Sequence, residues 1–229
     1  MTAPEETARA AVRTAIVTCQ LCPRLRAYGE NVAVVKKRAH RLDTYWGRPV
    51  PGFGDVNARM LIVGLAPAAH GANRTGRVFT GDGSGDFLMH ALHANGFANI
   101  PTAQHASDGL TLNDAYILTV VRCAPPDNKP TPGEIAQCRI HLEAESNLLH
   151  QVRVVVALGR IAWDGYLAFA RGCGTTTARH SFGHAAMISL GDHQPTLLGS
   201  YHPSRQNTNT GKLTPSMLNA VFAEARRHL

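Results

Sequence analysis

Four short apolar segments, spread along the chain, limit the possible fold more than any other feature. They read ARMLIVGL (58–65), AYILTVVRC (115–123), VRVVVALG (152–159) and PTLLGSY (195–201). None shows the alternation of apolar and polar residues that marks a strand with one face in water. Each therefore predicts a strand buried on both faces, as is typical of a parallel sheet.

Helical patterns separate these predicted strands. We expect helices over residues 3–18, within GDFLMHALHANGF (85–97), over TPGEIAQCRIHLEAESNLL (131–149), within IAWDGYLAFA (161–170) and from about Thr214. Thr131 and Glu134 have the spacing of a capping box, and the segment from 19 to about 51 reads as basic and irregular. The alternation predicts an α/β fold, a three-layer α/β/α domain with a central, mainly parallel four-stranded sheet, formed by residues 1–229 as one unit. Ligands of such folds bind outside the carboxyl ends of the strands.

Charge and hydropathy restrict the partners. The chain has 229 residues and a formal net charge of +7, which suits a polyanion, although many proteins are mildly basic. No apolar stretch approaches the roughly 20 residues of a membrane span, and the acidic start does not resemble a signal peptide. We expect a cytoplasmic protein that does not bind membranes.

A glycine-rich segment, GLAPAAHGANRTGRVFTGDGSGDF (64–87), follows the first predicted strand. Glycines allow close approach of the backbone, and amides at the start of a helix can face an anionic or carbonyl group. The segment contains neither a P-loop nor a dinucleotide fingerprint. Taken alone, it fits a tight turn equally well.

The cysteines form a second pattern. Cys19 and Cys22 are a C-x2-C pair, and Cys123 and Cys138 follow about a hundred residues later. This is not zinc-finger spacing, yet four thiolates on two separated segments suit either a [4Fe-4S] cluster or a structural zinc ion. Cys173 lies outside the pattern and reads as a free thiol.

Three segments in order resemble a known family. The glycine-rich segment, VRCAPPDNKPTP (121–132) and SYHPSRQNTNTGKLT (200–214) are similar to the motifs of family 5 uracil-DNA glycosylases, and the likeness runs from Cys19 to about Ser216. The resemblance implies the three-layer fold, flipping of a damaged base out of double-stranded DNA, and hydrolysis of its glycosidic bond. It also implies a [4Fe-4S] cluster on Cys19, Cys22, Cys123 and Cys138.

The resemblance assigns catalytic roles to two residues. Asp82 matches the proposed water-activating aspartate, and His202 matches the histidine that stabilises the leaving base. The position directly after the first strand, Leu65 to Ala68, offers no carboxylate, so Asp82 is the next available acid. The alternatives are an ordinary N-cap aspartate and a packed histidine.

Five residues are assigned to the base pocket. Phe79 matches the stacking position, with a core phenylalanine as the alternative, and Gly64, Ala66 and Ala68 line the turn. Thr119 stands where family 4 relatives carry an asparagine, so the candidate reader of the base edge is Asn128, although asparagine in such a turn is commonly structural. Because this pocket penalises few bases, it predicts excision of hypoxanthine alongside uracil.

The polar residues of the first and last motifs are assigned to DNA. Phosphate contacts are expected from Asn73, Arg74, Arg77, Arg205, Asn207 and Lys212. Leu213 occupies the place of the family's intercalating loop and would fill the gap that the flipped base leaves. The alternative places Leu213 as the first core residue of the last helix.

The sequence thus predicts a monomeric, monofunctional DNA repair glycosylase, nucleoid-associated in a prokaryote. It acts on duplex DNA with uracil or hypoxanthine and leaves an abasic site. One rival is an enzyme with a different preferred base, and another is a non-catalytic iron-sulfur protein that binds nucleic acid on the same fold. A uracil-crosslinking relative should carry an added basic histidine loop beside the first motif, which the sequence lacks.

Overall fold

A six-stranded sheet forms the centre of the molecule, in the strand order β1-β3-β2-β4-β6-β5. The computed structural model describes residues 3–175, 180–192 and 194–229. The four predicted strands are confirmed as the parallel strands β2 (Met60–Gly64), β3 (Ala115–Thr119), β4 (Val154–Leu158) and β6 (Thr196–Ser200). Two short edge strands that were not predicted, β1 (Phe53–Gly54) and β5 (Met187–Ser189), pair antiparallel with β3 and β6.

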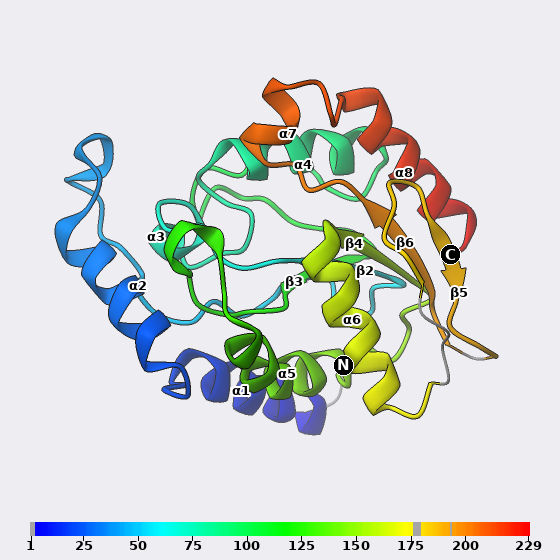
Figure 1. The fold of residues 1–229 in the computed structure, drawn as a ribbon, viewed down its shortest axis with the longest axis horizontal. Coiled ribbons are helices and arrows are strands. Elements are labelled where there is room, and N and C mark those ends of the chain that lie inside the picture. The colour runs from blue at the N-terminus through cyan, green and yellow to red at the C-terminus, as the bar shows by residue number, and fades with distance from the viewer. Residues whose placement is uncertain (1–2, 176–179, 193) are drawn as a thin grey trace.

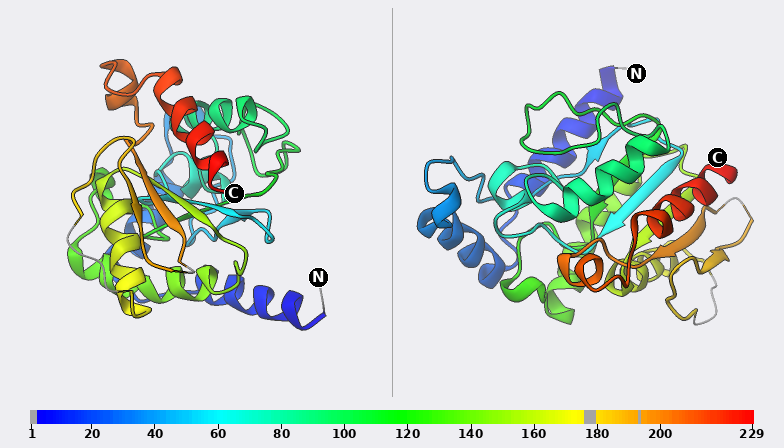
Figure 2. Two further views of the ribbon diagram at one scale, coloured as in Figure 1. Left: turned by 90° about the vertical axis from the view of Figure 1, so that its right-hand side faces the viewer. Right: turned by 90° about the horizontal axis from the view of Figure 1, so that it is seen from above.

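Helices cover both faces of this sheet, which confirms the three-layer prediction (Figures 1 and 2). One face packs against α4 (Gly83–Ala94) and α8 (Pro215–Arg227), and the other against α5 (Pro132–Ser146) and α6 (Arg160–Gly172). An outer helix, α1 (Ala3–Val17), lies along α5. The short helices are α3 (Ala72–Thr75), α7 (Arg205–Asn209) and the 3-10 turns η1 (Arg38–His40) and η2 (Pro126–Asn128).

Side chains of the central strands divide between the two faces. In β2, Met60 and Ile62 join the core under α4 and α8, whereas Leu61 and Val63 join the core under α5 and α6. All four are at most 1% exposed. Successive side chains of a strand point to opposite faces, so an unbroken apolar run is what a strand covered on both sides requires.

Side-chain caps mark the starts of α4, α5 and α8. The predicted capping box is present in α5, where the Thr131 side chain accepts a hydrogen bond from the Glu134 amide and the Glu134 carboxylate accepts one from the Thr131 amide. Thr214 caps α8 by accepting a hydrogen bond from the Met217 amide, and Asp82 caps α4 by accepting hydrogen bonds from the Ser84 and Gly85 amides. Satisfying these free amides sets where each helix begins.

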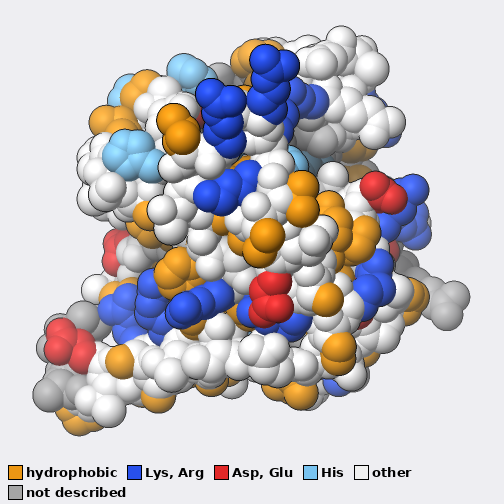
Figure 3. Space-filling model, turned by 90° about the vertical axis from the view of Figure 1, so that its left-hand side faces the viewer, with side chains coloured by type: hydrophobic (Ala, Val, Ile, Leu, Met, Phe, Trp, Pro, Cys, Tyr) orange, Lys and Arg blue, Asp and Glu red, His pale blue; other side chains and the backbone are white. Residues whose placement is uncertain are grey.

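The expectation that residues 19–51 are irregular was wrong, because α2 (Pro23–Val35) lies within them. Pro23 occupies the first turn, where no backbone donor is needed, and the helix buries Leu25 and Val32. Few apolar residues face the core, so the periodic signal in the sequence is weak. The helix ends at Lys36, whose φ of 56° is left-handed, and basic side chains follow on this side of the molecule (Figure 3).

A buried ion pair joins the sheet to α5. Arg122 is 1% exposed and its Nη1 lies 2.6 Å from Glu145 Oε2. The other carboxylate oxygen, Oε1, accepts hydrogen bonds from the Tyr116 hydroxyl and the Gly52 amide, both at 2.8 Å. The Glu145 carboxylate therefore joins α5 to β3 with the residues that follow it and to the segment at Gly52. If one charge of the pair were removed, water could not reach the other to solvate it.

We expect Glu145→Gln to lower the free energy of unfolding by about 3 kcal/mol, because it leaves the Arg122 guanidinium buried without a counter-charge. Urea unfolding followed by circular dichroism measures the change. Asp164→Asn is the control, since it removes the exposed i,i+4 pair with Arg160 and should change stability by less than about 0.5 kcal/mol. Equal effects of the two substitutions would show that the buried pair has no special role.

Candidate active site

The site lies at the carboxyl ends of the parallel strands. The register pairs Gly64 with Thr119 and Leu158 with Ser200, so the segments that follow β2, β3 and β6 leave the sheet at one edge. They enclose a cavity of about 580 Å³. Its walls come from the turn after β2, the start of α4, the loop around η2 and the segment before α7, and include Leu65, Ala66, Pro67, Ala68, Phe79, Asp82, Thr119, Asn128, His202 and Arg205.

Asp82 is both the N-cap of α4 and a wall of this cavity. Its Oδ1 accepts hydrogen bonds from the amides of Ser84 (2.9 Å) and Gly85 (3.0 Å). Burial raises the pKa of the Asp82 carboxyl, while these two amides and the charge of Arg205 oppose the shift. The two alternatives for this residue are therefore compatible, because the cap occupies one oxygen and fixes the direction of the other.

Phe79 lies against the carboxyl end of β2, in a strained conformation. Its φ is 48°, which a bulky residue rarely adopts. The ring packs so closely on the end of β2 that a Cβ at Gly64 would lie 2.7 Å from Phe79 Cε2. Phe79 is half-buried and lines the cavity, so one face of the ring remains available to a ligand.

His202 follows β6 and lies next to Phe79, with ring centroids 5.9 Å apart and planes 31° apart. Burial lowers the pKa of His202 to about 4, so the ring is neutral at neutral pH. No side chain in the described ranges forms a hydrogen bond with its ring nitrogens, whereas its backbone carbonyl accepts one from Asn207 Nδ2 at 2.8 Å. The imidazole can therefore donate a hydrogen bond to a ligand in the cavity.

The structure places both Asn128 and Thr119 in the cavity wall, but the Thr119 hydroxyl is already engaged. Thr119 is 1% exposed, and its hydroxyl donates to the Val121 carbonyl at 2.8 Å. Asn128 ends η2 with a φ of 56°, directly after Asp127 at 53°, and its side chain is exposed. Consecutive left-handed residues that are not glycine are costly, so this loop carries backbone strain at the cavity wall.

Three residues of the first motif that were assigned to DNA instead bind other groups of the protein. Asn73 is 2% exposed and donates to the Gly29 carbonyl. Arg77 is 6% exposed and forms a bidentate pair with Asp108 at 2.7 and 2.8 Å. Arg74 pairs with Asp43 at 2.8 Å and donates to two backbone carbonyls. These side chains hold the loop in shape and do not face solvent as phosphate ligands.

In the last motif, some of the residues assigned to DNA are exposed and others are used inside the protein. Arg205 is exposed and lines the cavity beside Gly83, and Lys212 is exposed with its Nζ 4.9 Å from the centre of the Tyr201 ring. Asn207 positions the His202 backbone. Leu213 is 1% exposed in the core under α4 and α8, as its alternative assignment as a core residue predicts.

The four matched cysteines meet behind the sheet edge, where Cys19, Cys22, Cys123 and Cys138 line one cavity together with Arg26, Gln137 and His141. Burial raises the pKa of the Cys123 thiol to about 12 and that of Cys138 to about 11. The Cys22 thiol donates to Gln137 Oε1, and the Arg122 amide donates to Cys138 Sγ. Among residues 3–175, 180–192 and 194–229, no group of three or more His, Cys, Asp or Glu is placed to hold a metal ion.

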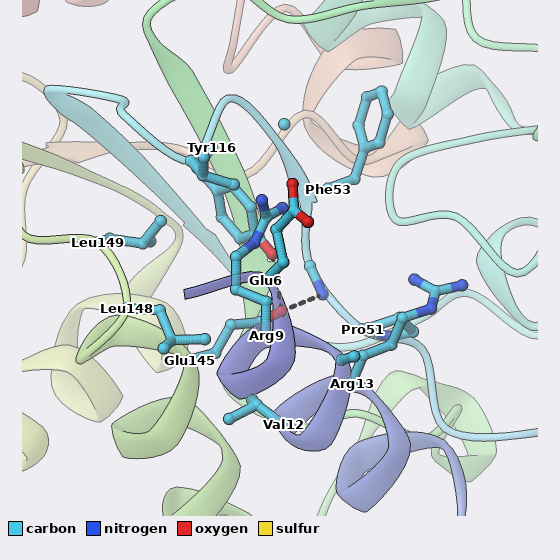
Figure 4. Close-up of a pocket in the computed structure, with 14 residues that line it drawn as sticks. Glu6, Arg9, Val12, Arg13, Pro51, Phe53, Tyr116, Glu145, Leu148 and Leu149 are labelled. Carbon is cyan, nitrogen blue, oxygen red and sulfur yellow. Dashed lines mark hydrogen bonds between the residues drawn. The ribbon is translucent and has the colours of Figure 1, made fainter. Parts of the chain in front are cut away.

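A second cavity, of about 470 Å³, lies between α1 and the segment around β1 (Figure 4). Arg9 and Arg13 stand at its edge, and Tyr116 and Glu145 lie at its base. The polar groups of that base bind one another and the Gly52 amide, as described above. Its lining includes Glu6 and Glu145 but no histidine, so it lacks the Asp–His combination of the first cavity.

Sequence reasoning missed two features of the site. Gly71 lies against Asp82, and a Cβ there would overlap Asp82 Oδ2. Lys129 follows Asn128 in the cavity wall and brings a positive charge to its mouth. The basic residue beside Asn128 is visible in PPDNKP, whereas the contact between Gly71 and Asp82 has no local signal.

Comparison with known proteins agrees with this geometry. Residues 51–226 match the uracil DNA glycosylase superfamily. A type-5 uracil-DNA glycosylase of Mycobacterium bovis is 53% identical over 213 residues, which cover 93% of this chain and 78% of that protein. One of Thermus thermophilus is 52% identical over 214 residues, with 93% and 94% covered. One of Pyrobaculum aerophilum is 43% identical over 210 residues, with 92% and 88% covered.

Within the part of the chain that the structure describes, no helix has the length and apolar character to cross a bilayer. The likeness to these type-5 proteins covers 92–93% of the chain. The chain belongs to the uracil DNA glycosylase superfamily and, within it, to the type-5 uracil-DNA glycosylases.

Proposed function

We propose that the protein is a DNA repair glycosylase that flips a deaminated base out of double-stranded DNA and hydrolyses its N-glycosidic bond, leaving an abasic site. The observation that carries this proposal is the convergence of Asp82, Phe79 and His202 on one cavity at the strand ends. A base in a duplex is inaccessible to such a cavity, so it must leave the helix to be processed. The names of the relatives support the same activity.

Each of the three residues has a role that its surroundings suit. Phe79 stacks on the flipped base. Neutral His202 donates a hydrogen bond to the base oxygen on which negative charge develops as the bond breaks, and a fixed donor in a dry site is effective there. Asp82 uses Oδ1 to bind the start of α4, which leaves Oδ2 to orient the attacking water.

We expect Asp82→Asn and His202→Ala each to slow base release by roughly 100-fold or more, because each removes an interaction made in the transition state. Single-turnover release of uracil from a duplex oligonucleotide measures the rate, and binding to the same duplex should change little. His93→Ala is the matched control, since His93 is exposed and lies on the solvent side of α4. Undiminished release by Asp82→Asn would contradict the role of its carboxylate, and no release by the wild type would favour a non-catalytic binding protein.

The pH dependence has a defined sign. Burial raises the pKa of Asp82, so its carboxylate takes up a proton at a higher pH than an exposed aspartate does. The release rate of the wild type should therefore fall on acidification, and this fall should be absent from the residual rate of Asp82→Asn. His202, already neutral above a pKa of about 4, should add no inflection near pH 6.5.

We propose that the four converging cysteines hold a [4Fe-4S] cluster. Their thiols are free of disulfides, come from two segments far apart in the sequence, and surround one cavity. Sulfur donors suit iron-sulfur clusters, and such a cluster would join the start of α2 to α5 and to the segment after β3. It would have a structural role, without taking part in the hydrolysis.

Anaerobically purified protein should be brown, and iron and acid-labile sulfide should be present in equal amounts. Cys123→Ser should lose both the colour and much of the stability, because it removes a ligand that ties separate segments together. Cys173→Ser, which alters an exposed cysteine outside the group, should retain both. Colourless protein that contains one zinc ion would contradict the cluster.

We propose that hypoxanthine is a substrate alongside uracil. Strong rejection of a wrong base requires a buried polar group that the wrong base leaves unpaired. The Thr119 hydroxyl already donates to the Val121 carbonyl, Ala66 and Ala68 offer no polar side chain, and Asn128 is exposed on a loop.

Duplexes with hypoxanthine should therefore lose the base, and mispaired lesions should react faster because they cost less to flip. The measurement is alkali-sensitive cleavage of matched duplexes that carry either uracil or hypoxanthine. Asn128→Ala tests whether Asn128 recognises the edge of uracil. If it does, the substitution should lower uracil release more than hypoxanthine release. Rapid uracil release with intact hypoxanthine would contradict the proposed breadth.

A further inference from the structure

The segment from Val34 to Leu42, here named the basic shoulder, projects from the body at the end of α2 (Figure 1). It carries Lys36, Lys37, Arg38 and Arg41 and contains no carboxylate. Its apolar residues are also in water, with Val34 80%, Val35 71% and Leu42 89% exposed. A folded protein rarely leaves such a mixture of charge and apolar surface without a partner.

The charges of the shoulder are not neutralised by the protein. In the described part of the chain, no carboxylate forms an ion pair with Lys37, Arg38 or Arg41. The nearest acid in the sequence, Asp43, is already engaged by Arg74 at 2.8 Å and by His40 at 3.4 Å. By contrast, Arg24, Arg26, Arg59, Arg77 and Arg122 each have a carboxylate partner.

Hydrogen bonds fasten the base of the shoulder to the catalytic motif. The Trp46 amide donates to the Arg74 carbonyl at 2.9 Å, and the Tyr45 hydroxyl lies 3.0 Å from His70 Nδ1. Arg74 joins the residue that follows the shoulder to the turn before α4. Its Nη1 donates to Asp43 Oδ2 at 2.8 Å, and its Nη2 donates to the Gly81 carbonyl at 2.9 Å. Gly81 is the neighbour of Asp82, so the shoulder is held in a fixed relation to the active site.

The position of the shoulder fits a ligand that also reaches the active site. The parallel strands point toward the side of the molecule where the end of α2, α3 and α7 lie (Figures 1 and 2). Lys and Arg side chains gather on the face that α2 presents, with apolar side chains between them (Figure 3). A duplex is long enough to reach beyond the cavity that takes a single base.

We infer that the basic shoulder is a second binding surface for DNA, contacting backbone phosphates of the duplex whose damaged base enters the cavity. This inference rests on the proposed function, because it assigns a further contact to the same substrate. Unpaired Lys and Arg side chains supply affinity by releasing counterions from the phosphates. The exposed apolar side chains can lie against sugar and base edges in the adjacent groove.

An anionic membrane is the other partner to which basic and apolar side chains together are suited. The attachment of the shoulder to Arg74 and Gly81 favours DNA, because a membrane would gain nothing from a fixed relation to a base-sized cavity. Vesicle binding is therefore the contrasting arm of the test.

The test compares two triple variants of equal net charge. One replaces the shoulder cations, Lys37→Gln, Arg38→Gln and Arg41→Gln. The control replaces exposed arginines of α5 and α6, Arg139→Gln, Arg160→Gln and Arg171→Gln. Binding of full-length protein to an undamaged duplex is measured by fluorescence anisotropy over a salt series, and urea midpoints verify that both variants fold as the wild type does.

The shoulder variant should bind about tenfold more weakly at low salt, and the slope of log K against log salt should be shallower by roughly two to three units. The control should keep the wild-type slope. Single-turnover base release at saturating protein should be unchanged in the shoulder variant, because the shoulder does not contact the reacting atoms.

Equal slopes in the two variants would overturn the inference, as would weakened binding to phosphatidylserine vesicles with unchanged DNA binding. The measurement remains valid if the wild type releases no base. In that case the proposed function fails, while the difference in salt slope still decides whether the shoulder binds DNA.

Discussion

Four parallel strands that end at the same level provide the constraint on which the rest of the molecule depends. Because Gly64 pairs with Thr119 and Leu158 with Ser200, the chain leaves the sheet at one edge from several strands. Residues that are more than a hundred positions apart, such as Asp82 and His202, then share one cavity without any direct bond between them. The four unbroken apolar runs let these strands lie side by side in the interior, since both faces of every central strand are covered by helices.

Charge is used for two separate purposes in this chain. Arg74, Arg77 and Arg122 build the protein, because each is largely buried and binds a carboxylate. Arg205 and the cations of the basic shoulder stay in water, so they are available to an anionic partner. A formal charge of +7 spread evenly would attract polyanions without orientation, whereas this division leaves only part of the cations free to bind an anion.

The sequence was informative wherever a local pattern has a physical cause. Buried strands require unbroken apolar runs and helix starts require caps, so β2, β3, β4, β6 and α5 were predictable. Motif similarity located Asp82 and His202, and the structure placed both in one cavity. Burial of individual side chains was not predictable, because it depends on distant segments: Arg77 meets Asp108, and Leu213 packs under α4 and α8. A helix with few inward-facing apolar residues, such as α2, likewise leaves little periodic signal.

The close contact between Gly71 and Asp82 makes the residue that position 71 can accept depend on the residue at position 82. Any side chain at 71 would occupy the space of the Asp82 carboxylate, so a single substitution there would displace the acid while leaving the sequence of the catalytic turn intact. Position 71 can therefore accept a side chain only if position 82 changes with it, or if the Asp82 carboxylate turns away. Because Gly71 has no Cβ and none fits beside Asp82, a change at position 71 depends on a change at position 82. This dependence limits the order in which substitutions can alter the chemistry of the pocket.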